Sequence, residues 1–307
     1  MQGVLTGFAV IAVVIAVGYV LGLRGHLGED GRTVLTRLAF NVATPALLFT
    51  TLARADLSVV LSGRLLVTAA STAVAAGVFL AFGVVRRWSI GRLTLGALCS
   101  SYVNAGNLGI PIAVYVLGDA SFVAPVLLFQ QIVVTPLALT VLDLSGRPGE
   151  RRRLGHRLTT PLRNPMAVGT LSGVTVAATG WTVPGPALEP LTLIGNMSVP
   201  AVLLAFGISL RGSGLPARGA DRPAIILSAA LKTIVQPLAA WAIGAGVLNL
   251  EREALLAVTV TSALPAAQNL FTYASQYRVA EQLTRESILL STAVSVPVLI
   301  AIAALLG

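Results

Sequence analysis

Long apolar runs separated by short polar segments repeat along the whole chain. Ten of them are close to the 20 residues that an α-helix needs to cross about 30 Å of hydrocarbon. Their approximate ranges are 4–23, 33–52, 59–85, 93–118, 121–142, 165–181, 191–210, 223–248, 254–277 and 287–306. The pattern predicts an all-α polytopic membrane protein with ten transmembrane helices. The first run is interpreted as a mature helix rather than a signal peptide, because it lacks a basic start and a small-residue cleavage motif before Arg24.

Composition agrees with this interpretation. The 307 residues are 55% hydrophobic and 11% charged, whereas soluble domains carry about 25% charged residues. Cys99 is the single cysteine, and His26 and His156 lie in loops without a metal-binding partner, so we expect no disulfide, metal or cofactor.

The basic residues alternate between loops. Of the 21 basic residues, 17 are arginines in the loops on one side, and the others are Arg54, Arg64, Arg252 and Lys232. The positive-inside rule makes the arginine-rich side cytoplasmic in the cell (inner or plasma) membrane, with both termini outside. The basic loop 147–164 fits this alternation, which favours contact with lipid headgroups over nucleic acid.

A motif of the form Asn-x-x-x-Pro-Ala-x-Leu occurs twice, starting at Asn41 and at Asn196. The copies lie in the second and seventh runs, 155 residues apart, so the repeating unit is five helices. An odd number of passes inverts the second copy, as in many secondary transporters. The chain then divides into repeats 1–146 and 165–307, joined by the basic loop 147–164.

The fourth run contains residues that interrupt helices in its stretch YVNAGNLGIPIAVYVLG. They are two amides, two glycines and a proline: Asn104, Asn107, Gly106, Gly109 and Pro111. Proline removes a backbone donor, and glycine permits a turn.

The ninth run matches the fourth at an offset of 154 residues, where Pro265 stands beside Gln268 and Asn269. Each proline alone could be an ordinary membrane-helix kink. Together they predict two broken helices that cross near mid-membrane. Unwound backbone is tolerated there only inside protein or beside a polar cavity.

Such a crossing would suit a small organic anion. Half-helix N-termini carry partial positive charge, and amides offer donors and acceptors. Asn104, Asn107, Gln268 and Asn269 are the main candidates, and Gln130 and Gln131 are weaker ones.

Three further polar residues can each be interpreted in two ways. Asn41 and Asn196 either line the site or join helices. Lys232, the single lysine, lies about 15 Å into its helix, too deep to reach the surface easily. It either serves the substrate or a proton, or pairs with backbone carbonyls.

Two other patterns bear on partners and coupling. Glycine pairs at 18/22 and 169/173 permit close packing, within the chain or in a homodimer. No Asp or Glu falls inside the ten runs, which argues against a carboxylate proton relay or sodium site.

The motifs NVATPALLF, NAGNLGIPIAVYVLGD, LPAAQNLFTYASQY and LLSTAVSVP resemble the auxin efflux carrier family, which includes bacterial malonate or malate permeases. The resemblance implies the fold shared with bile-acid transporters: runs 1, 2, 6 and 7 as a scaffold, and runs 3–5 and 8–10 as a transport domain. It also implies alternating access around broken helices four and nine, with crossover asparagines at Asn104, Asn107 and Asn269.

We therefore expect a secondary transporter of a small organic anion and not an enzyme. The alternatives are a sodium- or proton-coupled symporter, a membrane enzyme, which would need a reactive cluster that the sequence lacks, and a ligand sensor that moves no solute.

Overall fold

The computed structural model describes residues 2–54, 63–109, 112–113, 117, 120–145, 165–211 and 216–306. The regular structure in these residues is helical, apart from one isolated antiparallel bridge between Val103 and Ala266. Within the same residues, six helical segments are long and apolar enough to cross a membrane: Gly31–Leu52, Gly63–Val85, Pro125–Ser145, Gly185–Ser209, Arg222–Gly246 and Glu281–Leu306. The basic loop 147–164 lies outside the described residues.

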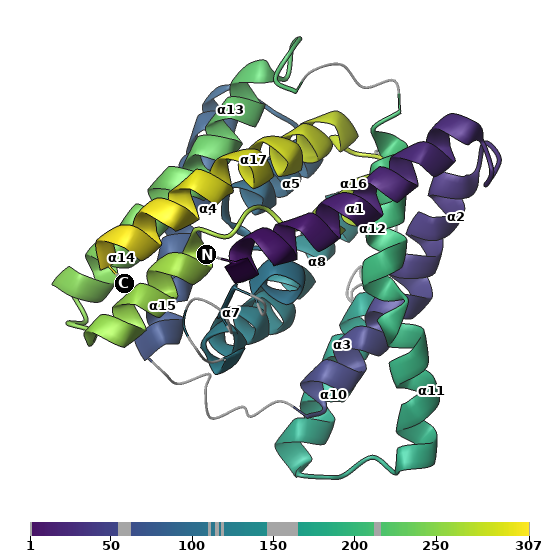
Figure 1. The fold of residues 1–307 in the computed structure, drawn as a ribbon, viewed down its shortest axis with the longest axis horizontal. Helices are drawn as coiled ribbons and strands as arrows, with labels where there is room; N and C mark the ends of the chain where they lie inside the picture. The colour runs from purple at the N-terminus through teal and green to yellow at the C-terminus, as the bar shows by residue number, and fades with distance from the viewer. Residues whose placement is uncertain are drawn as a thin grey trace.

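The helices gather into two groups (Figure 1). Group A, on the right of the view, is formed by the first two and the sixth and seventh apolar runs. Its helices are α1 (Gln2–Arg24), α2 (Gly31–Leu38), η1 (Ala39–Ala43), α3 (Thr44–Leu52), α10 (Pro165–Thr179), α11 (Gly185–Asn196) and α12 (Ser198–Ser209). Within it α1 packs on α12, and α3 packs on α10 and α11.

Glycines make these contacts in group A close. A Cβ at Gly18 of α1 would lie 2.5 Å from the carbonyl oxygen of Leu204 in α12. A Cβ at Gly173 of α10 would lie 2.9 Å from the carbonyl oxygen of Phe49 in α3. No larger side chain fits at such distances. Both glycine pairs seen in the sequence are therefore used for packing inside the chain.

Group B occupies the left and centre of Figure 1. Its longer helices are α4 (Gly63–Val85), α5 (Ile90–Ser101), α8 (Thr135–Ser145), α13 (Arg222–Ala230), α14 (Gln236–Gly246), α15 (Arg252–Ser262), α16 (Asn269–Tyr277) and α17 (Glu281–Leu306). Its short helical turns are η3 (Ala105–Gly109), η5 (Ala120–Val123), α7 (Ala124–Phe129), η6 (Gln130–Val134) and η7 (Leu231–Val235). Here α4 packs on α5 and α14, and α13 packs on α17.

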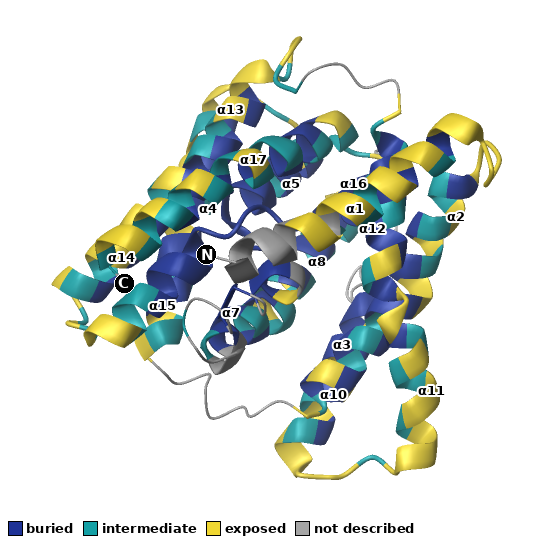
Figure 2. Cartoon of the chain, in the orientation of Figure 1, coloured by how far each residue is buried: buried dark blue, intermediate teal, exposed yellow. Residues whose placement is uncertain are grey.

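The buried residues concentrate between the elements, and the outward faces stay exposed (Figure 2). Many exposed side chains are large and apolar, among them Leu137, Leu193 and Leu238, which are 59–71% exposed. A soluble monomer rarely shows so much apolar surface. With the membrane-length helices, this surface indicates an integral membrane protein whose outer faces meet lipid.

Several apolar runs correspond to observed helices. The run 33–52 is α2 to α3, 165–181 is α10, and 223–248 is α13 to α14. The last helix, α17, begins at Glu281, six residues before the expected 287, so Glu286 is a buried carboxylate inside a helix. No Asp or Glu falls inside the ten apolar runs, but α17 extends beyond its run and therefore includes Glu286.

Candidate binding site at two broken helices

The fourth apolar run is broken directly after α5. The helix ends at Ser101, and Tyr102 has extended backbone angles (φ −85°, ψ 114°). Val103 donates its N–H to Gln130 Oε1 (2.6 Å), and Gln130 Nε2 donates to the Val103 carbonyl (3.1 Å). The amide of Gln130 thus takes the place of a neighbouring strand, which satisfies backbone groups that hydrocarbon could not.

The ninth run is broken between α15, which ends at Ser262, and α16, which starts at Asn269. Pro265 has no N–H and so leaves one donor fewer to satisfy. The next residue, Ala266, donates its N–H to Ser291 Oγ of α17 (3.2 Å).

The two breaks contact each other. Val103 and Ala266 form the antiparallel bridge, and Asn104 donates its backbone N–H to the Pro265 carbonyl (2.8 Å). The side chains join as well, because Asn104 Nδ2 donates to Gln268 Oε1 (2.5 Å). Asn104, Gln268 and Pro265 therefore lie together, as the sequence predicted for the members of one site.

The position of the first break differs from the expected one. The helix ends at Ser101, ten residues before Pro111. Pro111 lies outside the described residues, as does the side chain of Asn107. The Pro265 carbonyl accepts from Asn104, and the pairing of Pro265 with Pro111 stays a prediction. Of the two glycines, Gly109 packs closely, since a Cβ there would be 3.1 Å from Leu264 and Val123 side-chain atoms.

A cavity of about 230 Å³ lies beside the joined breaks. Group A contributes α3 and α12 to its wall, and group B contributes both breaks, α7 and η6. The lining residues are Thr44, Leu47, Leu48, Thr51, Leu52, Tyr102, Val103, Asn104, Ala105, Gly106, Leu127, Gln130, Gln131, Ser198, Val199, Val202, Ala267 and Asn269. The cavity is therefore placed between the two groups of helices.

The lining is mainly apolar, and its polar groups are uncharged among the described residues. Amides come from Gln131 and Asn269, and hydroxyls include Thr44 and Ser198, whose oxygens are 2.7 Å apart. The Gln131 Oε1 and Asn269 Oδ1 atoms are buried and have no hydrogen-bond partner among the described residues. Buried polar atoms are seldom left unpaired in proteins, so these two indicate a place where a ligand binds.

Gly106 is the exposed residue at the start of the second half-helix. A Cβ built at Gly106 meets no atom within 4 Å. Its backbone is therefore open to a solute in the cavity. Gly106 lies beside the first break, in the stretch that the sequence predicts to interrupt the fourth run.

Gln268 contacts Asn104 but is not among the residues that line the cavity. Three further sequence candidates do not line it either. Asn41 is exposed and donates Nδ2 to the Arg37 carbonyl (2.9 Å), and Asn196 is exposed at the end of α11. Nearby Thr44 and Ser198 line the cavity instead. The third candidate, Lys232, is described next.

Lys232 is fully buried in η7, behind the breaks. Its Nζ donates to Gln236 Oε1 and to the carbonyl of Ser262, both at 2.7 Å. Gln236 Nε2 in turn donates to the carbonyl of Ser101 (2.9 Å). One turn of helix thus caps the C-terminal ends of both α5 and α15, whose last carbonyls lack helical partners. Lys232 thus pairs with one backbone carbonyl and one side-chain amide oxygen, which agrees in part with the second interpretation given for it in the sequence.

Sequence reasoning missed Gln236 and Ser291, although a signal for Gln236 was present. It is a polar residue four positions after Lys232, on the same helix face and inside an apolar run. Ser291 gave no comparable signal, because serine is common in membrane helices.

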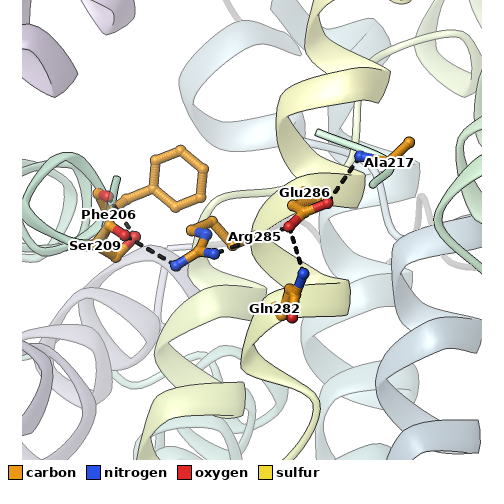
Figure 3. Close-up of polar contacts among 6 residues, drawn as sticks. All are labelled: Phe206, Ser209, Ala217, Gln282, Arg285 and Glu286. Atoms are coloured by element: carbon orange, nitrogen blue, oxygen red, sulfur yellow. Dashed lines mark hydrogen bonds and ion pairs between the residues drawn. The ribbon is translucent and has the colours of Figure 1, made fainter. Parts of the chain in front are cut away.

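The arginine-rich end is held by contacts around the start of α17 (Figure 3). Arg285 Nη1 donates to the Ser209 carbonyl at the end of α12 (3.0 Å), and so joins group B to group A. Glu286 accepts hydrogen bonds from the Ala217 N–H (2.8 Å) and from Gln282 Nε2 (2.9 Å). A second link between the groups is the ion pair of Arg32 with Glu281, at 3.0 Å.

The comparisons with known proteins were made for the whole chain. The model of the family described as "Membrane transport protein" matches residues 4–155 and 153–303. An "Uncharacterized transporter" of Methanothermobacter thermautotrophicus is 28% identical over 75% of this chain and 74% of its own length. "Uncharacterized transporter YfdV" of Escherichia coli K12 is 24% identical over 88% and 87%. A "Putative malonate transporter" of Rhizobium meliloti is 25% identical over 92% and 89%.

Proposed function

The chain belongs to the membrane transport protein family that includes the auxin efflux carriers, and from this premise we propose that it is a secondary transporter of a small organic anion. The family resemblance found in the sequence is thereby confirmed at the level of a membrane transporter. The substrate and the mechanism are our proposal.

The cavity at the joined breaks carries this proposal. Ala105 and Gly106 at the start of η3, and Ala267 and Asn269 at the start of α16, all border it. Half-helix N-termini present bare N–H groups and partial positive charge, which attract anions. Nearby amides add directional hydrogen bonds. A volume of about 230 Å³ suits a small metabolite, since pockets for drug-sized ligands run from roughly 300 to 1,000 Å³.

We propose that the chain consists of two inverted five-helix repeats, 1–146 and 165–307, joined by the loop 147–164. The packing supports this division. Gly18 packs on Leu204 and Gly173 packs on Phe49. The glycines of the two contacts are 155 residues apart, and so are their partners, which is the offset of the Asn-x-x-x-Pro motif. Two copies of one unit would produce such equivalent contacts.

We propose that group A is the scaffold and group B moves against it. The cavity lies between the groups, so relative movement would open it to one side and then the other. At the arginine-rich end, which we take as cytoplasmic by the positive-inside rule, the links of Arg285 to Ser209 and of Arg32 to Glu281 would have to break. The two chain ends then lie outside the cell.

Flux of candidate anions in proteoliposomes tests the proposal. Asn269→Ala removes an amide of the cavity and should lower the substrate affinity at least tenfold, with its thermal midpoint close to that of the wild type. Asn196→Ala makes the same substitution at an exposed position away from the cavity and should transport normally.

Three outcomes decide between the alternatives. Binding without flux would identify a sensor instead of a carrier. Flux that stops when a sodium or proton gradient is collapsed would identify a coupled symporter. Equal affinity of the two asparagine variants would place the site elsewhere.

A further inference from the structure

We propose that the groove between α4 and α13 binds an anionic phospholipid of the cytoplasmic leaflet. The groove shares no lining residue with the cavity at the helix breaks. The proposal needs only that the chain spans a membrane, so it goes beyond the proposed transport function. Three features of the described residues carry it: the apolar wall of the groove, two arginines beside it, and its place near the membrane surface.

The wall of the groove is apolar along most of its length. The groove has a volume of about 470 Å³, and its lining residues are Phe82, Arg222, Pro223, Ile226, Leu227 and Ala230. Ile226 is 44% exposed, so the groove opens outward from group B. In a membrane protein such an outward apolar face contacts acyl chains.

The groove also has the length of one leaflet. Arg222 is the first residue of α13. Ala230 is eight positions further on, which is about 12 Å along a helix. Half of the hydrocarbon thickness is about 15 Å. An acyl chain that starts beside Arg222 can therefore follow the wall through most of one leaflet.

Two guanidinium groups lie beside one end of the groove. Arg222 lines it, and the Arg86 guanidinium lies 5.4 Å from the centre of the Phe82 ring on the α4 side. Both arginines are exposed, and the ion pairs of the described residues do not include them. The neighbouring carboxylate of Asp221 is paired with Arg92 at 2.8 Å. Arg86 and Arg222 therefore keep their charge for an external anion.

An aromatic side chain at this end indicates the level of the lipid headgroups. The Trp88 and Phe82 rings pack edge to face with centroids 5.6 Å apart, and the Arg92 guanidinium lies 4.5 Å from the centre of the Trp88 ring. Tryptophan is enriched where a membrane meets water. Arg86 and Arg222 belong to the arginine-rich side, which we take as cytoplasmic, and the cytoplasmic leaflet is the one that carries anionic lipids.

The arginines select the headgroup, whereas the apolar wall would accept the acyl chain of any lipid. Guanidinium groups bind phosphate oxygens with charge-assisted hydrogen bonds. In phosphatidylcholine a quaternary ammonium group stands close to the phosphate and would be repelled by two arginines. Phosphatidylglycerol has the same phosphate without that positive charge, so we expect it to be preferred.

Competition between two lipids with the same acyl chains measures this preference. The purified protein is placed in nanodiscs with equal amounts of dioleoyl phosphatidylglycerol and dioleoyl phosphatidylcholine. Native mass spectrometry then gives the ratio of the two among the most firmly retained lipids. One arginine near an anionic lipid contributes roughly fivefold in affinity, so two arginines should give a ratio of at least tenfold.

Paired variants connect the preference to the groove. The double variant Arg86→Gln with Arg222→Gln keeps polar side chains at the mouth and should lower the ratio to about twofold. Arg24→Gln with Arg37→Gln is the matched control, because it removes two exposed arginines at the same end of group A and should keep the wild-type ratio. The single variant Arg222→Gln should give an intermediate ratio, and it decides the question if the double variant does not fold.

A ratio near one for the wild type, or an equal fall in both double variants, would overturn the proposal.

A second measurement separates a lipid from a soluble phosphate ester. Phosphatidylglycerol should raise the thermal midpoint of the delipidated protein, since a ligand of the folded state stabilises it. The deacylated headgroup glycerophosphoglycerol should leave the midpoint unchanged. An equal rise with both compounds would show a phosphate site without a lipid and overturn the proposal. So would a dimer that persists without lipid and is lost in the Arg86→Gln, Arg222→Gln variant, because a second copy would then occupy the groove.

Discussion

Both helix breaks leave buried backbone groups without helical hydrogen bonds, and the two breaks satisfy these groups in different ways. At the first, the Gln130 amide bonds to both the N–H and the carbonyl of Val103, and the carbonyl also accepts from the Ala105 N–H. At the second, Pro265 leaves no N–H to satisfy, and a single hydroxyl, Ser291 Oγ, accepts from Ala266. The first break therefore depends on one side chain for two hydrogen bonds to its backbone, whereas the second needs one hydrogen bond fewer because Pro265 has no N–H.

The C-terminal sides of the breaks also differ. The α15 end is capped by the Lys232 ammonium group, and the α5 end by the neutral Gln236 amide. Replacement of Gln130, Lys232 and Ser291 in turn shows which break limits stability, because each of these side chains contacts one break more than the other.

The largest effect is expected for Gln130→Leu. It leaves the buried N–H of Val103 unpaired, at a cost of about 1–3 kcal/mol, and it removes one of the two hydrogen bonds to the Val103 carbonyl, which keeps the one from the Ala105 N–H. The thermal midpoint in detergent should fall by the largest amount of any variant here, and transport should fall with it.

Gln131→Leu is the matched control for that variant, since the adjacent glutamine has an unpaired oxygen and holds no backbone. It should keep the thermal midpoint and change only ligand affinity. An equal loss of stability in both variants would show that the hydrogen bonds of Gln130 to Val103 do not specifically stabilise the break.

Lys232→Met should have the next largest effect on stability. The variant removes the donor to the Ser262 carbonyl and to Gln236 Oε1, which destabilises, but it also removes a buried charge, which offsets part of the loss. We expect a lower thermal midpoint and a substrate affinity within about twofold of the wild type, since Lys232 does not line the cavity. Lost transport with an unchanged thermal midpoint would instead give Lys232 a direct part in carrying substrate or protons.

A smaller effect is expected for Ser291→Ala, which removes one hydrogen bond at the second break, worth about 1 kcal/mol. Ser295→Ala is its control one turn further along α17, where the hydroxyl bonds within its own helix to the Thr292 carbonyl. Chemical denaturation of both variants measures the difference. A larger loss for Ser291→Ala than for Gln130→Leu would reverse the ranking of the two breaks.

The smallest effect on stability, and the most specific one, is expected for Arg285→Met. The variant removes a link between the groups, so the cavity should open more often toward the arginine-rich end. A cysteine placed at Leu48, with Cys99 replaced by serine, reports this as a several-fold faster reaction with an impermeant reagent in inverted vesicles. Arg211→Met is the control, because Arg211 bonds to the Gly22 carbonyl within group A. The same labelling rate in both variants would contradict a gating part for Arg285.

Much of the fold and part of the site follow from the sequence. Apolar runs give many of the helices because the length needed to cross the hydrocarbon is fixed. Amides beside proline and glycine gave Asn104, Gln268 and Asn269, since unwound backbone needs polar partners. The sequence could not give the place of the first break, because Gln130 on another helix fixes it at Val103. It also assigned Asn41 and Asn196 to the site, although the orientation of a helix about its own axis depends on packing.

The empty space beside Gly106 makes the free volume of the cavity depend on the side chain at this position. A Cβ at this position meets no atom within 4 Å among the described residues outside its own turn, so an alanine would take up room in the cavity without a clash there. Under the proposed transport function, we expect alanine, valine and leucine at position 106 to lower stepwise the size of the largest solute carried.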